Sequence, residues 1–243
     1  MKLCSAGASL GTIISFSGVF MSIIELKDIN FSYGPSEERV IKSLSLSIER
    51  GECILLEGPN GSGKSTLFRI LNGLSLPDSG TYYFDSRLID KKYLKNERDA
   101  KVFHKEIGYL FQNPDIMLFC ASVYDEIGFG PRQMGLDDVE VDKRVRDLLK
   151  TFDIEKLADK APYHLSGGQK KKIAFAAVMA LNPKAYILDE PFAGLDRESC
   201  EMIGRLIKNL KLMGKTIIIA SHDESDIGEL ADRRLNIVEL MQD

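Results

Sequence analysis

The chain has 243 residues, of which 44% are hydrophobic and 28% are charged, a balance that excludes an intrinsically disordered protein. This length suffices for one large domain, or two small ones, with a self-sufficient core. Thirty-six acidic residues against 32 lysines and arginines give a net charge of -4. This charge argues against a general nucleic-acid binder, because such proteins usually carry a basic excess.

Residues 1–20 differ from the rest of the chain. No charge lies between Lys2 and Glu25, a pattern that could indicate a membrane span or an export signal. Serines and glycines dilute the apolar residues, and a second methionine, Met21, directly precedes a strand pattern. We therefore expect an unstructured extension over 1–20 and a folded domain over 21–243.

The first half of this domain alternates apolar and polar residues, which is typical of strands. A turn at Gly34-Pro35 separates the first two strands, and a short apolar run at 53–56 indicates a strand buried on both faces. Residues 85–103 are rich in charge and lack a clear period, so we expect a surface segment there. The expected strands cover 24–33, 40–48, 53–56, 80–85 and 107–111, with one helix over 64–72.

The second half is mainly helical. Four apolar residues recur at helical spacing from Val141 to Phe152, and this pattern predicts an amphipathic helix. Because buried strands alternate with helices, we expect an α/β fold with a mainly parallel sheet covered by helices on both faces. The remaining expected elements are helices over 168–181, 198–212 and 224–230, and strands over 185–188 and 216–220.

A phosphate-binding loop lies between the buried strand at 53–56 and the following helix. Residues Gly58–Ser65 match G-x-x-x-x-G-K-[ST]. Backbone amides and the helix N-terminus offer partial positive charge to a phosphate, Lys64 adds a full charge, and the Ser65 hydroxyl can ligate Mg²⁺. The sequence thus predicts a nucleotide site that contains Pro59, Asn60, Gly61, Ser62, Gly63, Lys64, Ser65 and Thr66.

Two carboxylates, Asp189 and Glu190, end the hydrophobic strand at 185–188. Asp189 can orient the shell of Mg²⁺, and Glu190 can polarise a water toward the γ-phosphate as a general base. The alternative is an acidic pair that is favoured only by the dipole of the next helix. The phosphate-binding loop favours the catalytic interpretation.

Leu165-Ser166-Gly167-Gly168-Gln169 precedes a helix, and its glycines and hydroxyl suit close approach to a phosphate. Together with the phosphate-binding loop, this pentapeptide resembles ATP-binding cassette (ABC) ATPases over about residues 22–235. The resemblance implies a P-loop NTPase fold with an antiparallel β subdomain and a helical subdomain over about 113–165. It also implies that two cassettes sandwich ATP, each offering Ser166, Gly167, Gly168 and Gln169 to the site of the other.

The same resemblance assigns roles to single residues that would otherwise be interpreted as surface or packing positions. Gln112 corresponds to the glutamine that touches Mg²⁺ and water, and Ala193–Asp196 corresponds to the D-loop of the family, whose Asp196 is expected among the ATP-binding residues. His222 corresponds to the histidine near the γ-phosphate, and Tyr33 to the aromatic residue that stacks on adenine. The implied catalytic set is Lys64, Gln112, Glu190 and His222, with Ser65, Gln112 and Asp189 as metal ligands.

The segment 112–136 indicates which group of ABC ATPases the chain resembles. It carries QNPD, LF and FGP in order, and is similar to the ATPases of energy-coupling factor (ECF) and cobalt/nickel importers. This similarity implies ATP-driven import of a vitamin or a transition-metal ion through separate membrane subunits, at the cytoplasmic face of the membrane. The second cassette is a copy or a paralogue, and no nucleic acid is expected.

Alternatives from the same residues are an ATPase of another ABC transporter, such as an amino-acid importer or an exporter, and a soluble ABC clamp on nucleic acid or ribosomes. Intact Lys64, Asp189, Glu190 and His222 argue against a binding module without turnover. The segment 112–131, with its apolar residues 116–119, is expected to dock a short cytoplasmic helix of a membrane protein, and the alternative is a hydrophobic core plug. The three lysines 170–172 are expected on a solvated helix face.

Overall fold

The computed structural model describes residues 22–34, 36–221 and 230–241. The predicted extension over 1–20 and His222 lie outside these residues, and so does most of the helix expected over 224–230. Among the described residues, no helix is both long and apolar enough to cross a lipid bilayer.

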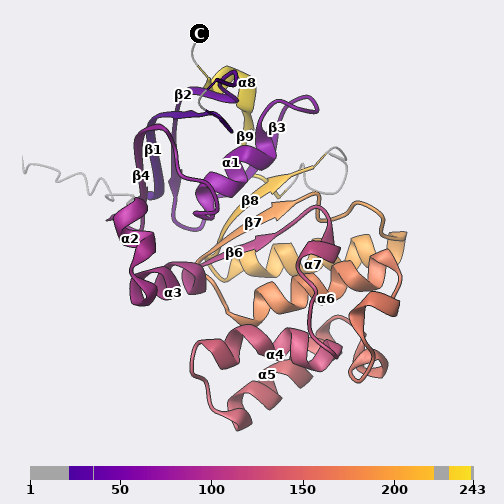
Figure 1. The fold of residues 1–243 in the computed structure, drawn as a ribbon. Helices are drawn as coiled ribbons and strands as arrows, with labels where there is room; N and C mark the ends of the chain where they lie inside the picture. The colour runs from indigo at the N-terminus through magenta and orange to yellow at the C-terminus, as the bar shows by residue number, and fades with distance from the viewer. Residues whose placement is uncertain (1–21, 35, 222–229, 242–243) are drawn as a thin grey trace, which may run out of the picture.

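An antiparallel sheet forms one end of the molecule (Figure 1). Its strands run in the order β2-β1-β4-β5, and β1 pairs with both β2 and β4. Alternation of apolar and polar residues along β2 explains its burial, because every second side chain enters the core. The strand bounds are β1 Ser22–Phe31, β2 Ile41–Glu49, β4 Ser79–Phe84 and β5 Arg87–Leu88.

A five-stranded sheet lies in the centre, in the order β6-β7-β8-β3-β9. All its neighbouring strands are parallel, as the continuous apolar runs predict. The carboxyl ends of these strands therefore share one edge of the sheet, where the sequence places its polar motifs. The strand bounds are β3 Cys53–Glu57, β6 Ile107–Leu110, β7 Ala185–Asp189, β8 Thr216–Ala220 and β9 Arg233–Asn236.

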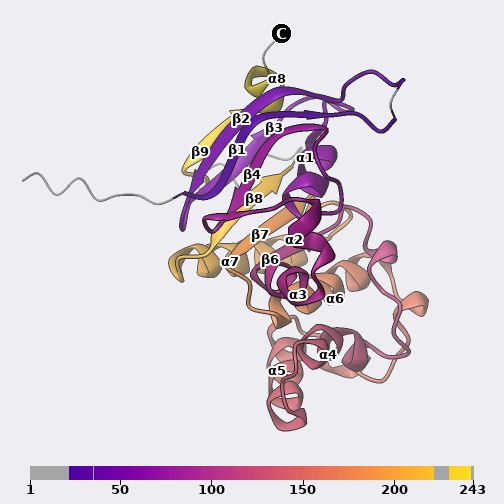
Figure 2. The same ribbon diagram turned by 60° about the vertical axis from the view of Figure 1, so that its left-hand side comes forward.

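Helices cover both faces of the central sheet, and Figure 2 shows α4 and α5 grouped at the end away from the antiparallel sheet. The longer helices are α1 Lys64–Leu71, α3 Glu97–Glu106, α4 Val123–Gln133, α5 Asp138–Thr151, α6 Gly167–Ala180 and α7 Arg197–Leu212. Short helices are α2 Lys91–Lys95 and α8 Ile237–Leu240, with 3-10 turns at Pro114–Ile116, Glu155–Leu157 and Pro162–His164.

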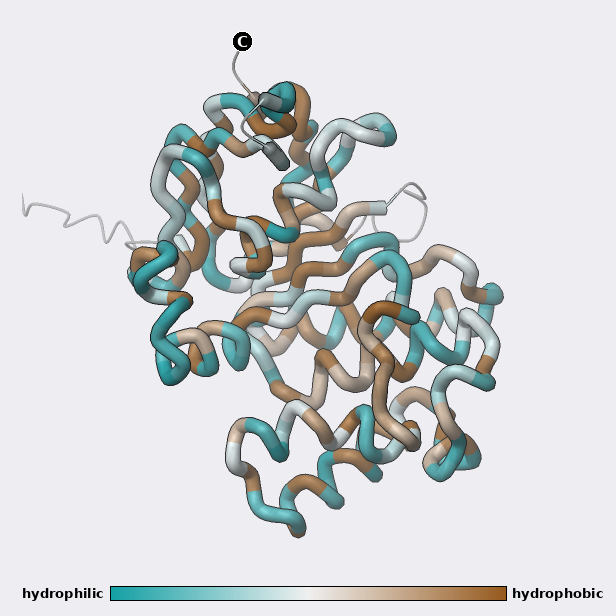
Figure 3. Tube along the Cα trace, in the orientation of Figure 1, coloured by the Kyte–Doolittle hydropathy of each residue, from teal (hydrophilic) through white to brown (hydrophobic). Residues whose placement is uncertain are grey.

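The central sheet separates two hydrophobic cores. Side chains alternate along β3, so that Leu55 packs with α4–α7 on one face, whereas Ile54 packs with α1, α3 and the antiparallel sheet on the other. Figure 3 shows this pattern as hydrophobic segments along the strands and inner helix faces, with hydrophilic segments outside. The parallel sheet, antiparallel sheet and helices confirm the predicted fold class.

Residues 85–103 lie mostly on the surface, as predicted, but the segment also contains regular elements that were not predicted, β5, α2 and most of α3. Its helices are short and mostly exposed, so little apolar periodicity marks them. Asp90 and Asn96 cap the two helices with their side chains, and Phe103 is fully buried. The edge strand β9 was also missed, because its Arg233 and Arg234 are exposed.

Candidate functional site

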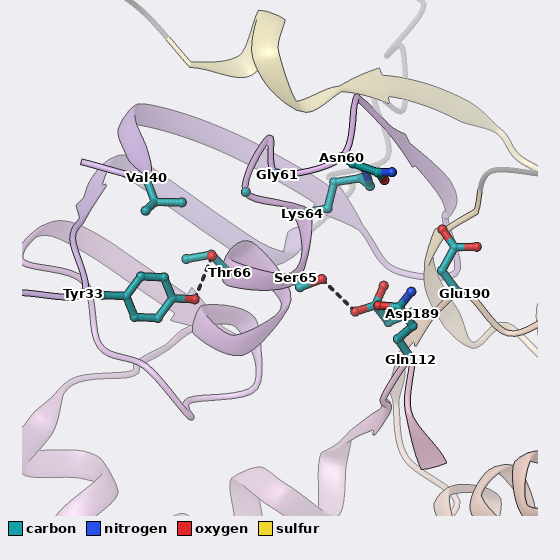
Figure 4. A pocket seen from close by; sticks show the side chains of 11 residues that line it. Tyr33, Val40, Asn60, Gly61, Lys64, Ser65, Thr66, Gln112, Asp189 and Glu190 are labelled. Carbon is teal, nitrogen blue, oxygen red and sulfur yellow. Dashed lines mark hydrogen bonds between the residues drawn. The ribbon is translucent and has the colours of Figure 1, made fainter. Parts of the chain in front are cut away.

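A cavity of about 370 Å³ opens at the carboxyl edge of the central sheet (Figure 4). Most of its lining comes from the loop after β3, the start of α1, and the residues at or just after the ends of β6 and β7. This edge is the usual place for a ligand in a parallel α/β sheet. It is lined by Tyr33, Val40, Asn60, Gly61, Gly63, Lys64, Ser65, Thr66, Gln112, Asp189 and Glu190. The predicted phosphate, metal and base residues thus meet in one cavity.

The phosphate-binding loop is held tightly against its surroundings. A Cβ on Gly58, whose φ is 148°, would lie 2.7 Å from Ile237 of α8, so a larger residue does not fit there. The Lys64 ammonium donates hydrogen bonds to the Gly58 and Pro59 carbonyl oxygens, at 2.6 and 3.1 Å. Pro59 and Ser62 belong to the loop but do not line the cavity.

Asp189 ends β7 and is 4% exposed. Its carboxylate accepts hydrogen bonds from the Ser65 hydroxyl at 3.0 Å and from the Tyr109 hydroxyl at 3.3 Å. Burial raises the pKa of Asp189, while these hydrogen bonds and the charges of Lys64 and Lys171 act in the opposite direction. The phosphate-binding loop and the acidic strand end are therefore joined directly. Tyr109 is a contributor that sequence reasoning missed, although it lies only three residues before Gln112.

Glu190 follows Asp189 with a φ of 49°, in the left-handed region that residues with a Cβ rarely adopt. Its amide donates to the Ala220 carbonyl at 2.9 Å, and its side chain lies in the cavity (Figure 4). Its carbonyl oxygen accepts a hydrogen bond from the Lys171 ammonium at 2.6 Å. A carboxylate in this place can accept a proton from a water beside a bound phosphate.

Lys171 corrects one prediction. Of the three lysines that follow Gln169, Lys170 pairs with Asp115 at 2.7 Å and Lys172 is half-buried, but Lys171 is only 3% exposed. The solvated-face prediction is wrong for Lys171, because α6 packs this side against the end of β7. Helical spacing places Lys171 on the same face of α6 as Ala174, Phe175 and Val178, which are all buried, so this periodicity could have distinguished it from the two neighbouring lysines.

The two ends of the cavity differ in character (Figure 4). Tyr33 lies at one end with 56% of its surface exposed, its ring edge-on to Phe31 and its hydroxyl hydrogen-bonded to Thr66 at 2.9 Å. Gln112 lies at the other end beside Asp189. An aromatic ring at one end and charged groups at the other suit a nucleotide, with its base near Tyr33 and its phosphates near Lys64.

Some predicted residues do not reach this cavity. Ser166 caps α6 in a reciprocal pair with Gln169, and Asp196 caps α7 through the Ser199 amide at 2.8 Å. Gly168 lies near Leu195 and Gly194, so these two loops are neighbours. None of the residues Ser166, Gly167, Gly168, Gln169 and Asp196 lines the cavity.

Comparison with known proteins decides the family. A family model described as ABC transporter matches residues 41–193. The chain belongs to the ABC transporter family. It is an ABC ATPase of the ECF and cobalt/nickel type, and ATP is its nucleotide.

Three similar proteins place this ABC ATPase within its family. The nickel import ATP-binding protein LarO of Lactiplantibacillus plantarum is 44% identical over 208 residues, covering 86% of each chain. The energy-coupling factor transporter ATP-binding protein EcfA of Methanocaldococcus jannaschii is 41% identical over 215 residues, covering 88% of this chain and 75% of EcfA. A solved structure, CbiO1 of Clostridium perfringens from the transporter complex CbiONQ, has a TM-score of 0.75 and 39% identity, covering 88% and 84%.

Proposed function

We propose that this ABC ATPase powers import of a transition-metal ion or a vitamin through separate membrane subunits, at the cytoplasmic face of the membrane. The names of LarO, EcfA and CbiO1 support this proposal, because they describe nickel import, an energy-coupling factor transporter and a transporter complex. The observation that carries the chemistry is the meeting of Lys64, Asp189 and Glu190 in one cavity beside Tyr33.

The hydrolytic step follows from the positions of these groups. Backbone amides of the phosphate-binding loop and the start of α1 face the phosphates, and Lys64 exchanges its carbonyl partners for phosphate oxygens. Glu190 accepts the proton of the attacking water, and Gln112 orients that water. His222, which lies outside the described residues, stays a prediction for the γ-phosphate.

Magnesium fits the oxygen groups of the cavity. Mg²⁺ prefers a few protein oxygens together with phosphate oxygens and water, and the Ser65 hydroxyl and Asp189 carboxylate are already 3.0 Å apart. Over the described part of the chain, there is no cluster of three or more His, Cys, Asp or Glu side chains suited to a metal. We propose Ser65, Asp189 and Gln112 as its ligands, where the ion would neutralise phosphate charge.

A second cassette, a copy or a paralogue, completes the site in this proposal. The supporting observation is that Ser166–Gln169 and Asp196 are solvent-accessible yet lie outside the cavity of their own chain. The reciprocal cap between Ser166 and Gln169 fixes the start of α6, where the amides of the first turn have no carbonyl partner within the helix. A helix N-terminus presented in this way can bind a phosphate on a facing molecule.

The membrane-facing surface is proposed to include the apolar residues after Gln112. Ile116 and Phe119 are 65% and 68% exposed, whereas Met117 and Leu118 pack partly against the core. The predicted docking segment therefore has an exposed and a buried half. Glu126 fixes it, because its carboxylate accepts hydrogen bonds from the Phe119 and Cys120 amides at 2.9 and 2.7 Å.

Detergent extraction of the tagged chain from native membranes tests the proposal. We expect Phe119→Asp to lower recovery of integral membrane partners at least about tenfold, as is usual for a central aromatic contact, without unfolding the chain. The matched control is Val139→Asp, because Val139 is 81% exposed on α5. The expected partners are a small vitamin- or metal-binding membrane protein and a separate coupling protein. Recovery of amino-acid importer or exporter subunits would contradict the substrate class, and equal loss with both variants would contradict the docking surface.

A further inference from the structure

A buried lysine at the start of α6 has no role in the function described so far. Lys171 is 3% exposed, and burial lowers the pKa of its ammonium while the charges of Glu190 and Asp189 act in the opposite direction. Burial of a charged group is costly unless hydrogen bonds and opposite charges compensate it. For Lys171, the compensating hydrogen bond and opposite charges come from residues at the end of β7.

The contact of Lys171 is with the backbone of Glu190. The Nζ atom donates to the Glu190 carbonyl oxygen at 2.6 Å, and this oxygen also accepts from the Ala193 amide at 3.3 Å. The Glu190 amide is held separately by the Ala220 carbonyl at 2.9 Å. The backbone amide and the backbone carbonyl of Glu190 are therefore both held, the amide by the end of β8 and the carbonyl by Lys171 of α6.

Fixing the backbone fixes the direction of the side chain. A left-handed conformation is strained for a residue with a Cβ, and it persists only where the surroundings enforce it. At Glu190, it turns the side chain into the cavity directly after Asp189 has pointed toward Ser65. Without the ammonium, one of the groups that enforce this conformation is lost.

The position of Lys171 on α6 connects Glu190 to the Ser166–Gln169 segment. It lies five residues after Ser166, about 7.5 Å along the helix axis. One helix thus carries both the segment proposed to bind the ATP of the second cassette and the cation that holds Glu190 of its own site.

We propose that Lys171 is a positioning residue for hydrolysis, which holds Glu190 in its left-handed conformation and ties it to the Ser166–Gln169 end of α6. The proposal rests on the proposed function of Glu190 as general base. When a second cassette closes on Ser166–Gln169 of this chain, the first turns of α6 would transmit the contact to Glu190 of this chain through Lys171.

Replacement of Lys171 by methionine tests this inference. Met keeps an unbranched side chain that is one atom shorter, and it removes the charge and the hydrogen bond. We expect kcat for ATP to fall about 10- to 100-fold, as misplacement of a reacting group commonly does, with KM within about twofold. The control is Lys215→Met, because Lys215 also donates to a backbone carbonyl, that of Pro183 at 2.8 Å, but lies away from the cavity. It should leave kcat unchanged.

A double variant separates positioning from mere stability. If Lys171 acts through Glu190, then adding Lys171→Met to Glu190→Gln should cause no further loss of single-turnover hydrolysis. Losses that multiply, an unchanged kcat, or a rise in KM alone would each overturn the inference. Loss of activity in Lys171→Met but not in Glu190→Gln would instead contradict the general base.

Conservative variants keep the test decisive if Lys171→Met does not fold. Lys171→Arg retains a cationic donor, and Lys171→Gln has a shorter neutral one. We expect the arginine variant to be at least about threefold faster than the glutamine variant at equal ATP binding. Equal rates in these two folded variants would overturn the positioning role.

Discussion

The side chain of Glu190 lies in the cavity proposed to bind ATP, at a point where a buried strand has just ended. Its neighbour Asp189 is engaged by the hydroxyls of Ser65 and Tyr109, so the two adjacent acids have different surroundings. At the end of a strand, two successive carboxylates point in different directions. One of them can therefore face a metal while the other faces a water.

We expect Glu190→Gln to bind ATP normally and to lose about 10²–10⁴-fold in kcat, because an amide cannot accept the proton of the attacking water. Phosphate release and equilibrium binding of a labelled nucleotide measure the two effects separately. Glu198→Gln is a control, since Glu198 is an exposed residue of α7. A Glu190→Gln rate within about twofold of wild type would exclude Glu190 as the base.

Among the elements, the turn between β4 and β5 is held by a network of charges. Asp85 is hydrogen-bonded to Lys184 at 2.8 Å and to Arg50, and Arg87 joins it to Glu106 of α3. The network therefore ties the antiparallel sheet to the residues just before β7. Burial alone would raise the pKa of Asp85, but the hydrogen bonds from Lys184 and Arg50 outweigh burial and hold the pKa below its usual value.

We expect Asp85→Asn to lower the free energy of unfolding by about 1 kcal/mol at neutral pH, a value discounted for the exposure of its partners. Asn tolerates the φ of 50° at this position, so the substitution adds no backbone strain. Because the folded pKa of Asp85 is lowered, its stabilisation is fully present above the unfolded value near 4 and disappears as the pH falls through the folded value.

Urea unfolding of both proteins between pH 3 and 7 checks this prediction. The difference between wild type and Asp85→Asn should shrink at the acid end of the range. Asp153→Asn serves as control, because Asp153 is exposed and also has a positive φ, of 53°. A difference that stayed constant with pH would show that the charge of Asp85 contributes nothing.

Elements differ in how far the sequence determines them. The strands and helices around the site were predicted to within a few residues, because their apolar runs and glycine-rich loops reflect burial and tight turns. The helices α2 and α3 were not, since only Phe103 of their residues is fully buried and the polar caps Asp90 and Asn96 look like loop residues. At the site, the same limit applied to Lys171 and Tyr109, whose importance depends on contacts with residues far along the chain.

At the scale of the whole molecule, each proposed active site draws on two chains. Lys64→Ala and Ser166→Arg should each be inactive alone, because each variant breaks both sites of its own dimer. In a heterodimer of the two, one site carries both defects and the other carries none. Random pairing should therefore restore about a quarter of the wild-type rate, if one intact site suffices and the chain pairs with itself.

ATP hydrolysis measured against total protein concentration checks this complementation. Ser166→Arg also removes the cap of α6, so Asp137→Arg, which removes the cap of α5, controls for the expected loss of about 1 kcal/mol in stability. A specific activity that is independent of concentration in a demonstrated monomer, and unchanged by Ser166→Arg, would contradict the shared site.

The separation of the two hydrophobic cores by the central sheet bears on how such a protein can be re-engineered. Phe175 belongs to the core under the helices and Phe84 to the core under the antiparallel sheet, and the two clusters have no buried residue in common. Mutations at distant sites without shared partners have additive effects on stability. Each central strand, however, supplies alternate side chains to both cores, as Leu55 and Ile54 of β3 do. The half proposed to meet the membrane proteins can therefore be exchanged between relatives only together with the strand side chains that face its own core, while the strand residues on the other face stay with the core under the antiparallel sheet.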